Sequence, residues 1–155
     1  MTRDDFEFSF VVHGPPCSKK RGKGALLHPF RGKGKPQYCP ICKRKLLAVV
    51  INSSTAERWQ RKAVAELESQ WKFEPIPKTI PINARIVSYL PTARLIDADN
   101  LYAGPGDALQ EAGILEDDCS IVSHDGSRRL IDRKNPRAEI TLTPATIVEK
   151  VKVTG

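Results

Sequence analysis

Residues 94–101 read Arg94-Leu95-Ile96-Asp97-Ala98-Asp99-Asn100-Leu101, and further acidic residues follow at Asp107 and at Glu116-Asp117-Asp118. Five aspartates and two glutamates therefore lie within residues 97–118 of a chain whose formal net charge is +7. Mg²⁺ prefers oxygen ligands and is usually bound by one or two carboxylates together with phosphate oxygens of the substrate. A carboxylate cluster in a basic protein therefore indicates a divalent-cation site on a surface that attracts polyanions.

The spacing of the first two aspartates limits how they can share an ion. Asp97 and Asp99 are two positions apart, so they point to the same side of an extended segment and diverge on a helix. We expect Asp97 at a strand end and Asp99 at the bend into a helix, with Asp118 returned to the same edge. An EF-hand is excluded, because Leu101 and Tyr102 stand where a ligand and a glycine are needed. A set of helix caps and turn residues remains the structural alternative.

The positive charge is concentrated in two clusters, which favours binding to a phosphate backbone over a merely solvated surface. The chain has 25 Lys+Arg and 18 Asp+Glu. The first cluster has no acidic residue within it and contains Lys19, Lys20, Arg21, Lys23, Arg31, Lys33, Lys35, Lys43, Arg44 and Lys45. The second contains Arg128, Arg129, Arg133, Lys134 and Arg137. From these clusters and from Arg94, the residues expected to contact nucleic acid are Lys19, Lys20, Arg21, Lys23, Lys43, Arg44, Lys45, Arg94, Arg128 and Arg129.

Composition excludes two other classes of protein. No apolar run approaches the roughly 20 residues of a membrane span. Four cysteines in 155 residues do not indicate a secreted disulfide scaffold. The N-terminal residues are charged and lead into a strand, unlike a signal peptide. We therefore expect a cytoplasmic protein.

Hydrophobic periodicity predicts a small mixed fold. Strands are expected at residues 6–12, 46–51, 82–89, 119–123 and 137–143. A helix is expected from the Ser53-Ser54-Thr55 caps to Trp71, with Trp59, Ala63, Leu67 and Trp71 forming an apolar stripe. The two tryptophans are expected to be core anchors.

A second helix is expected at residues 107–112, with Gly113 as its C-cap. Its start is expected near Pro105, because proline favours the first turn and disfavours a helix interior. Residues 17–45 show little periodicity and are expected to form an inserted loop. The predicted fold is a single α/β (α+β) domain over residues 1–155, a small sandwich with a mixed β-sheet, helices on one face and this cysteine-containing insertion.

The acidic segment resembles the signature of the RusA family of Holliday-junction resolvases. The resemblance rests on Asp97-Ala98-Asp99-Asn100-Leu101, Asp107-Ala108-Leu109, Gly113 and Asp117-Asp118, whose spacing matches without a gap. It extends more loosely to the first strand with Gly14-Pro15-Pro16, the helix from Thr55 and the last strand. It implies a small homodimeric, Mg²⁺-dependent endodeoxyribonuclease that acts on branched DNA, and many members of the family are encoded by phages.

The resemblance also assigns roles to residues. It implies that Asp97, Asp99 and Asp118 are the catalytic metal ligands, that Asn100 matches the family asparagine and that Asp107 is structural. One departure matters, since the family usually carries a catalytic lysine four residues after the second aspartate, where this chain has Ala103. Either another cation replaces it, with Arg94, Arg128 and Lys134 as candidates, or turnover is weakened or lost.

The insertion contains the pattern Cys39-Pro40-Ile41-Cys42, which is typical of a zinc knuckle. One pair is half of a tetrahedral site, so Cys17 and His28 are predicted to complete it, with His13 or a second subunit as alternatives to His28. A redox Cys-x-x-Cys pair is the competing interpretation, but it needs a strand-to-helix setting. A bound Zn²⁺ would order this basic loop as a phosphate-binding surface.

Two single residues remain. Cys119 is expected to pack in a buried strand. His124 is expected to be a solvated turn residue, with a general base as the alternative.

Three functions are therefore open. The first is a RusA-like endonuclease resolving Holliday junctions, and the second is a junction-binding protein whose active site is weakened at Ala103. The third is another Mg²⁺-dependent nuclease or phosphohydrolase.

Overall fold

Alternating apolar residues build the central strands of the protein. The computed structural model describes residues 6–17, 54–93, 96 and 98–146, together with the backbone of 24–27 and 48–51. Its strands are β1 (Phe8–His13), β2 (Gly24–Leu27), β3 (Ala48–Ile51), β4 (Ile82–Leu90), β5 (Ile121–Ser123), β6 (Arg128–Ile131) and β7 (Arg137–Pro144). Its helices are α1 (Ser54–Gln70), α2 (Ala98–Glu111) and the short 3₁₀ helix η1 (Asp118–Ser120). None of the helices in the described part of the chain is long and apolar enough to cross a membrane.

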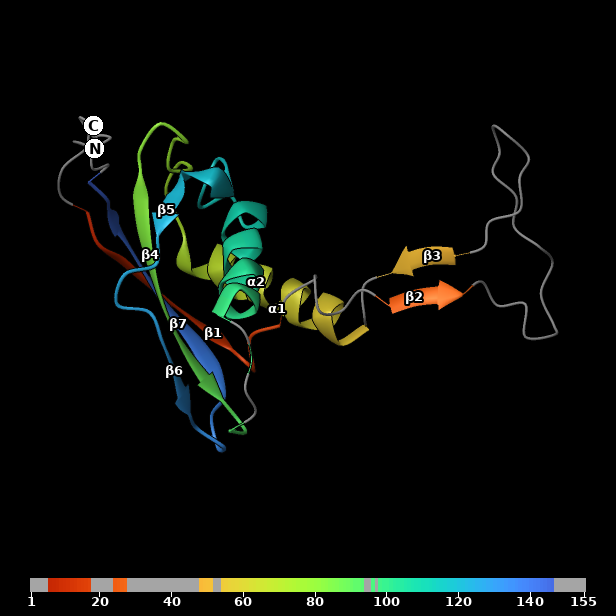
Figure 1. The fold of residues 1–155 in the computed structure, drawn as a ribbon. Coiled ribbons are helices and arrows are strands. Elements are labelled where there is room, and N and C mark those ends of the chain that lie inside the picture. Colours follow the sequence, from red (N-terminus) through yellow and green to blue (C-terminus); the bar gives the residue numbers. More distant parts are fainter. Residues whose placement is uncertain are drawn as a thin grey trace, which may run out of the picture.

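The main sheet is mixed, as predicted. Its order is β1-β7-β4-β5, and β6 also pairs with β4. Strands β1 and β4 are antiparallel to β7, whereas β5 and β6 are parallel to β4. Figure 1 shows the sheet as one layer with α1 and α2 beside it. The predicted α+β class with a mixed sheet is confirmed.

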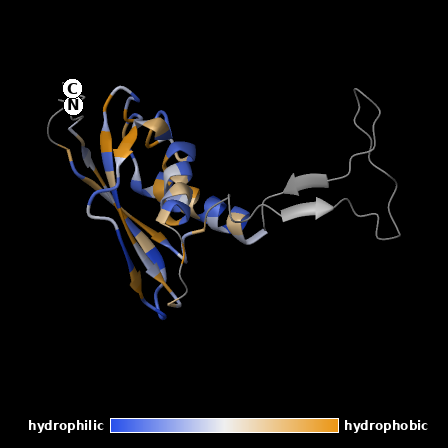
Figure 2. Ribbon diagram, in the orientation of Figure 1, coloured by the Kyte–Doolittle hydropathy of each residue, from blue (hydrophilic) through white to orange (hydrophobic). Residues whose placement is uncertain are grey.

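One face of this sheet forms the core. In β4 the buried positions alternate with less buried ones, as they do in β1 over Phe10, Val11 and Val12. The same alternation of hydrophobic and hydrophilic segments is visible along the strands in Figure 2. Apolar residues of α1 and α2, such as Leu67 and Leu109, join the buried strand residues in one hydrophobic cluster. The predicted apolar stripe is confirmed, since Trp59, Ala63 and Leu67 of α1 are buried. Trp71, which directly follows α1, is buried too and is 8% exposed.

The second helix departs from the prediction. It starts at Ala98 and runs to Glu111 with Pro105 inside it, so the expected start near Pro105 is wrong. Proline lacks the N–H that would pair with the Leu101 carbonyl, and glycine is a poor helix former. Packing outweighs these costs, because Gly104, Pro105 and Gly106 are all buried. A Cβ on Gly104 would lie 2.5 Å from the Cys17 carbonyl oxygen, so only glycine allows this close approach.

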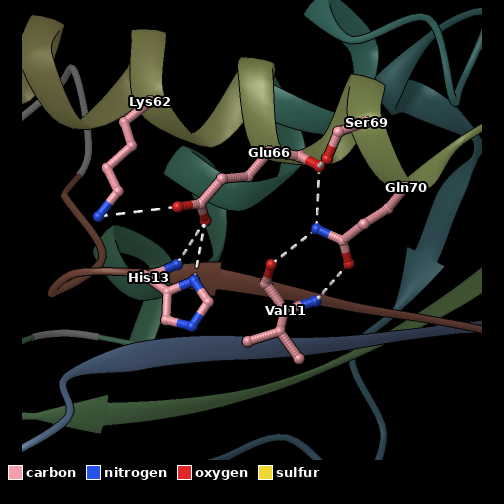
Figure 3. A network of polar contacts seen from close by, with 6 residues as sticks. All are labelled: Val11, His13, Lys62, Glu66, Ser69 and Gln70. Atoms are coloured by element: carbon pink, nitrogen blue, oxygen red, sulfur yellow. Dashed lines mark hydrogen bonds and ion pairs between the residues drawn. The ribbon is translucent and has the colours of Figure 1, made fainter.

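The free edge of β1 is covered by α1 (Figure 3). The Gln70 side chain accepts a hydrogen bond from the Val11 N–H at 3.0 Å and donates one to the Val11 carbonyl at 2.9 Å. One turn earlier, the Glu66 carboxylate accepts from the His13 N–H at 2.7 Å and lies 3.3 Å from its Nδ1. These three backbone groups of the β1 edge are therefore paired within the molecule and are not available to another strand.

Other strand predictions are corrected. The expected strand 119–123 begins only at Ile121, because residues 118–120 form η1. Cys119 is exposed, so its expected burial is wrong. Strand β2 lies within the segment expected to be a loop, and it pairs with β3 as a separate two-stranded sheet. Strand β6 was seen in the sequence only as part of a basic cluster.

Candidate active site

One face of α2 carries the acidic residues of the site. Asp99, Ala103 and Asp107 recur every four residues, so they lie above one another on the helix. Asp99 lies in the first turn, where the positive end of the helix dipole favours a negative charge. Ala103 lies between the two aspartates on this face. It is the position at which the resemblance to the RusA family would lead one to expect a lysine.

The chain returns to this site through a glycine. Gly113 has a φ of 69°, which side-chain-bearing residues rarely adopt. The Gly113 N–H donates to the Gln110 carbonyl, and the Ile114 N–H donates to the Leu109 carbonyl, each at 3.0 Å. This pattern ends the helix as the predicted C-cap. The chain then runs beside Ile76, whose N–H donates to the Ile114 carbonyl at 2.8 Å.

The backbone around Asp118 is fixed on both sides. The Asp117 carboxylate caps η1 by accepting from the Cys119 N–H at 2.9 Å. This backbone hydrogen bond is the main reason that the pKa of Asp117 lies below its usual value. The interaction with Asp117 also raises the pKa of the Cys119 thiol, which disfavours the reactive thiolate. The Gln110 side chain of α2 accepts from the Asp118 N–H at 3.3 Å. Asp117 and Gln110 therefore hold Asp118 against α2.

These residues surround a common pocket of about 350 Å³. It is lined by Asp99, Tyr102, Ala103, Gly106, Asp107, Asp118, Ile121 and His124. Asp99 and Asp118 are 19 positions apart in sequence and both line this pocket, whereas Asp97 lies outside the described residues. A larger hollow of about 650 Å³ near Asn83 and Thr143 has Asp125 as its only carboxylate among the described lining residues.

The donor set of the pocket suits a hard divalent cation. Three carboxylates line it, and carboxylate oxygens are the ligands that Mg²⁺ prefers. Among the described residues, no group of three or more His, Cys, Asp or Glu side chains is arranged to hold a metal ion. The predicted ligand set of Asp97, Asp99 and Asp118 therefore depends on Asp97, whose placement is not described.

The pocket also contains His124, which the sequence analysis expected to be a solvated turn residue. His124 follows β5, is half-buried and stacks on Tyr102 with ring centroids 4.7 Å apart. Its Nδ1 lies 2.8 Å from the Ala84 carbonyl oxygen. The expectation of a solvated turn residue is therefore wrong. His124 is six residues after Asp118, with β5 between them. This spacing alone does not indicate that the two residues line the same pocket.

The predicted cations are not among the described pocket residues. Arg128 and Lys134 do not line the pocket, and Arg94 lies outside the described residues. Arg128 and Arg129 are exposed on β6, and the Arg129 Nη1 donates to the Ile96 carbonyl at 3.5 Å. Arg129 thus reaches the segment that leads into Asp97. The other predicted DNA contacts, Lys19, Lys20, Arg21, Lys23, Lys43, Arg44 and Lys45, lie outside the described residues.

Arg137 of the second basic cluster is occupied elsewhere. Its guanidinium lies 3.6 Å from the centre of the Tyr89 ring. It also pairs with Glu139 at 2.8 Å and with Asp132 at 3.0 Å. Burial alone would lower the pKa of Arg137, but the hydrogen bonds to Glu139 and Asp132 raise it above its usual value. Arg137 therefore stabilises this part of the protein and is a poor candidate for phosphate binding.

The predicted zinc ligands fall largely outside this description. Cys39, Cys42 and His28 are not among the described residues. Cys17 is half-buried and its carbonyl lies against Gly104. The zinc site therefore stays a prediction.

Comparison with known proteins identifies the chain. No curated protein matches it. The family model for the endodeoxyribonuclease RusA matches residues 31–143, almost three quarters of the chain. The match includes α1, the whole of α2 and every residue that lines the acidic pocket. The chain belongs to the RusA endodeoxyribonuclease family.

Proposed function

We propose that this protein is a Mg²⁺-dependent endodeoxyribonuclease that resolves Holliday junctions or other branched DNA by phosphodiester hydrolysis. The observation that carries the proposal is the meeting of Asp99, Asp107 and Asp118 in one pocket. Their chemistry suits a metal site, and membership of a nuclease family gives that site a substrate.

The aspartates have different tasks in this proposal. Asp97, Asp99 and Asp118 would hold Mg²⁺, which when bound supplies positive charge that polarises the scissile phosphate. Gln110 and Asp117 keep the Asp118 backbone in place, so that its carboxylate stays opposite α2. Asp107 lines the same pocket one turn beyond Ala103 and completes its negative charge.

The proposed partner is DNA, bound by a homodimer. Exposed Arg128 and Arg129 support binding of a polyanion near the pocket, because Arg129 contacts the segment before Asp97. Symmetric cutting of a four-way junction requires two active sites related by a two-fold axis. The edge of β1 is already satisfied by Glu66 and Gln70, so we do not expect it to pair with a second subunit.

A second function is favoured by Ala103. Because residue 103 lines the pocket, the missing lysine leaves a gap in the positive charge where the phosphate would bind. Loss of one electrostatic group of this kind costs about 10²–10³ in rate. The protein would then bind junctions and cut them slowly or not at all.

A structural Zn²⁺ held by Cys39, Cys42, Cys17 and His28 is a separate part of the proposal. Metal analysis of the purified protein tests it, with Cys39→Ser as the comparison. One equivalent of zinc lost in the variant is the expected result. Equal zinc content in both proteins would contradict it.

The test of the main function is single-turnover cleavage of a labelled synthetic four-way junction in Mg²⁺. The wild type is compared with Asp99→Asn and with Glu74→Gln, which neutralises an exposed carboxylate that does not line the pocket. We expect paired symmetric nicks from the wild type and Glu74→Gln, and loss of cleavage in Asp99→Asn.

The alternatives give different results. Tight, salt-sensitive junction binding without cleavage by the wild type would support the weakened binding protein. Equal cleavage of the junction and of a linear duplex would support a different nuclease. Cleavage by Asp99→Asn at the wild-type rate would show that this pocket is not the active site.

A further inference from the structure

His124 is held at the pocket by two separate contacts. Its ring stacks on Tyr102 of α2 with an interplanar angle of 29°. Its Nδ1 lies 2.8 Å from the carbonyl oxygen of Ala84 in β4. The ring is therefore fixed between the helix that carries Asp99 and the central strand of the sheet.

The contact with Ala84 sets the hydrogen positions on the ring. A carbonyl oxygen can only accept a hydrogen bond, so Nδ1 must carry the hydrogen. In the neutral ring the lone pair is then on Nε2. Within the described part of the chain, no contact occupies Nε2. His124 therefore presents a proton-accepting nitrogen while its other nitrogen is held by the backbone.

The other side chains of the pocket leave this task open. Asp99 and Asp118 are assigned to the metal, and a carboxylate that binds a cation is a weaker base. Asp107 also lines the pocket, and its side chain or backbone already takes part in an interaction within the protein. Ala103 and Gly106 have no functional group, and Tyr102 supports the ring. Of the described residues that line the pocket, His124 is the one with a nitrogen base.

We propose that His124 is the general base of the hydrolysis, a role that rests on the proposed nuclease function. Nε2 takes a proton from the attacking water while the water oxygen forms its bond to phosphorus. The bond from phosphorus to the leaving sugar oxygen breaks, and that oxygen keeps the electron pair and takes a proton from solvent. The imidazolium then returns its proton to solvent, so the protein is unchanged after each cut.

This role is different from that of a lysine at position 103. A lysine supplies fixed positive charge to the phosphate, whereas neutral His124 accepts a proton. A positioned general base contributes typically 10²–10⁴ in rate. His124 thus allows hydrolysis to proceed without the family lysine and does not substitute for its charge.

Two substitutions distinguish the role of Nδ1 from the role of Nε2. His124→Asn retains an amide N–H close to the Nδ1 position, so the contact with Ala84 can persist, but nothing replaces Nε2. His124→Gln places an amide N–H near the Nε2 position, which can donate a hydrogen bond but cannot accept a proton. A general base predicts that both variants lose about 10²-fold or more in single-turnover cleavage. His124→Ala, with imidazole added to the buffer, should recover part of its lost rate.

Measurements other than cleavage complete the test. The melting temperature and the affinity for the junction without Mg²⁺ should be near wild type in His124→Asn. Cleavage at the wild-type rate by this variant would overturn the proposal. The proposal would also be overturned if a large fall in the melting temperature or junction affinity of His124→Asn fully accounted for its lost activity and imidazole did not rescue His124→Ala. Retained activity in His124→Gln alone would show that Nε2 acts as a hydrogen-bond donor and not as a base.

The outcome for the nuclease function is distinguishable. One possible result is that the wild type and His124→Asn cleave the junction and Asp99→Asn does not. The nuclease function would then be supported, and the role of His124 as general base would be contradicted. If the wild type binds the junction but does not cut it, both fall together.

Discussion

The two long helices are built in opposite ways. Helix α1 has 17 residues with buried Ala56, Trp59, Ala63 and Leu67 at helical spacing. Helix α2 has 14 residues and contains Gly104-Pro105-Gly106, which local preferences would exclude from a helix interior. Both contribute to the same hydrophobic core. The first is specified by its own sequence pattern, whereas the second depends on what it packs against.

This difference coincides with a difference in function. Helix α1 covers the sheet and satisfies the edge of β1 through Glu66 and Gln70. Helix α2 carries Asp99, Ala103 and Asp107 along one side of the acidic pocket. Its small residues let it approach the chain at Cys17, and this approach sets where the carboxylates lie. Poor local preference is therefore found in the helix that positions the proposed active site.

The largest effect on this comparison is expected from Ala103→Lys. The substitution adds a cation to the pocket face of α2, between Asp99 and Asp107. We expect the rate of junction cleavage to rise by about 10²–10³, because one electrostatic group at a developing charge has an effect of this size. Single-turnover kinetics at saturating protein measure the change.

The control must carry the same charge elsewhere. Thr79→Lys adds a lysine at an exposed position that does not line the pocket. It is expected to strengthen DNA binding slightly and to leave the cleavage rate unchanged. Equal rates for the wild type and Ala103→Lys would show that the protein does not need a cation at this position.

Much of the fold could be predicted from periodicity. The alternation of β4 and β7 and the four-residue spacing of Trp59, Ala63 and Leu67 each depend on one buried face, and this is a local property. The start of α2 could not be predicted in this way. The residues that make the helix possible, Cys17 and Trp59, are far from Gly104 in sequence, and their contact exists only in the folded protein.

The residues of the candidate site show the same contrast between local sequence pattern and tertiary contacts. Asp99 and Asp118 were found because their spacing resembles a family signature, and the structure places both at one pocket. For His124 the sequence favoured a solvated turn residue over a general base, because its contacts are with Tyr102 and Ala84, neither of which is near it in sequence. Spacing identifies residues of a shared motif, but it gives no information on a residue that tertiary contacts alone bring to the site.

A smaller effect is expected from adding one methyl group to each glycine of α2. Glycine to alanine in a helix normally stabilises, by about 0.4–1 kcal/mol. Gly104→Ala should instead destabilise by about 1–3 kcal/mol, because its Cβ would lie 2.5 Å from the Cys17 carbonyl oxygen. Gly106→Ala should follow the normal rule, since its Cβ would lie 3.7 Å from Ile121.

Denaturant unfolding of the two variants measures this contrast directly. Both substitutions change the same helix by the same group, two positions apart, so they control for each other. If Gly104→Ala were as stable as Gly106→Ala, the close approach to Cys17 would not be what sets the path of α2.

The smallest effect is expected on α1, from Gln70→Ala. The substitution removes two hydrogen bonds to the Val11 backbone (Figure 3), each of which contributes about 0.5–1.5 kcal/mol when water does not replace it. Since these groups are exposed and alanine is the better helix former, we expect a loss of only about 1 kcal/mol. The Val11 amide should nevertheless exchange its hydrogen faster, and an uncovered strand edge should increase self-association at high concentration. Glu68→Ala, which removes an exposed side chain from the same turn, should change neither property. Unchanged exchange at Val11 in Gln70→Ala would mean that the β1 edge is protected by the sheet itself, and the contribution of α1 would then be limited to its buried face.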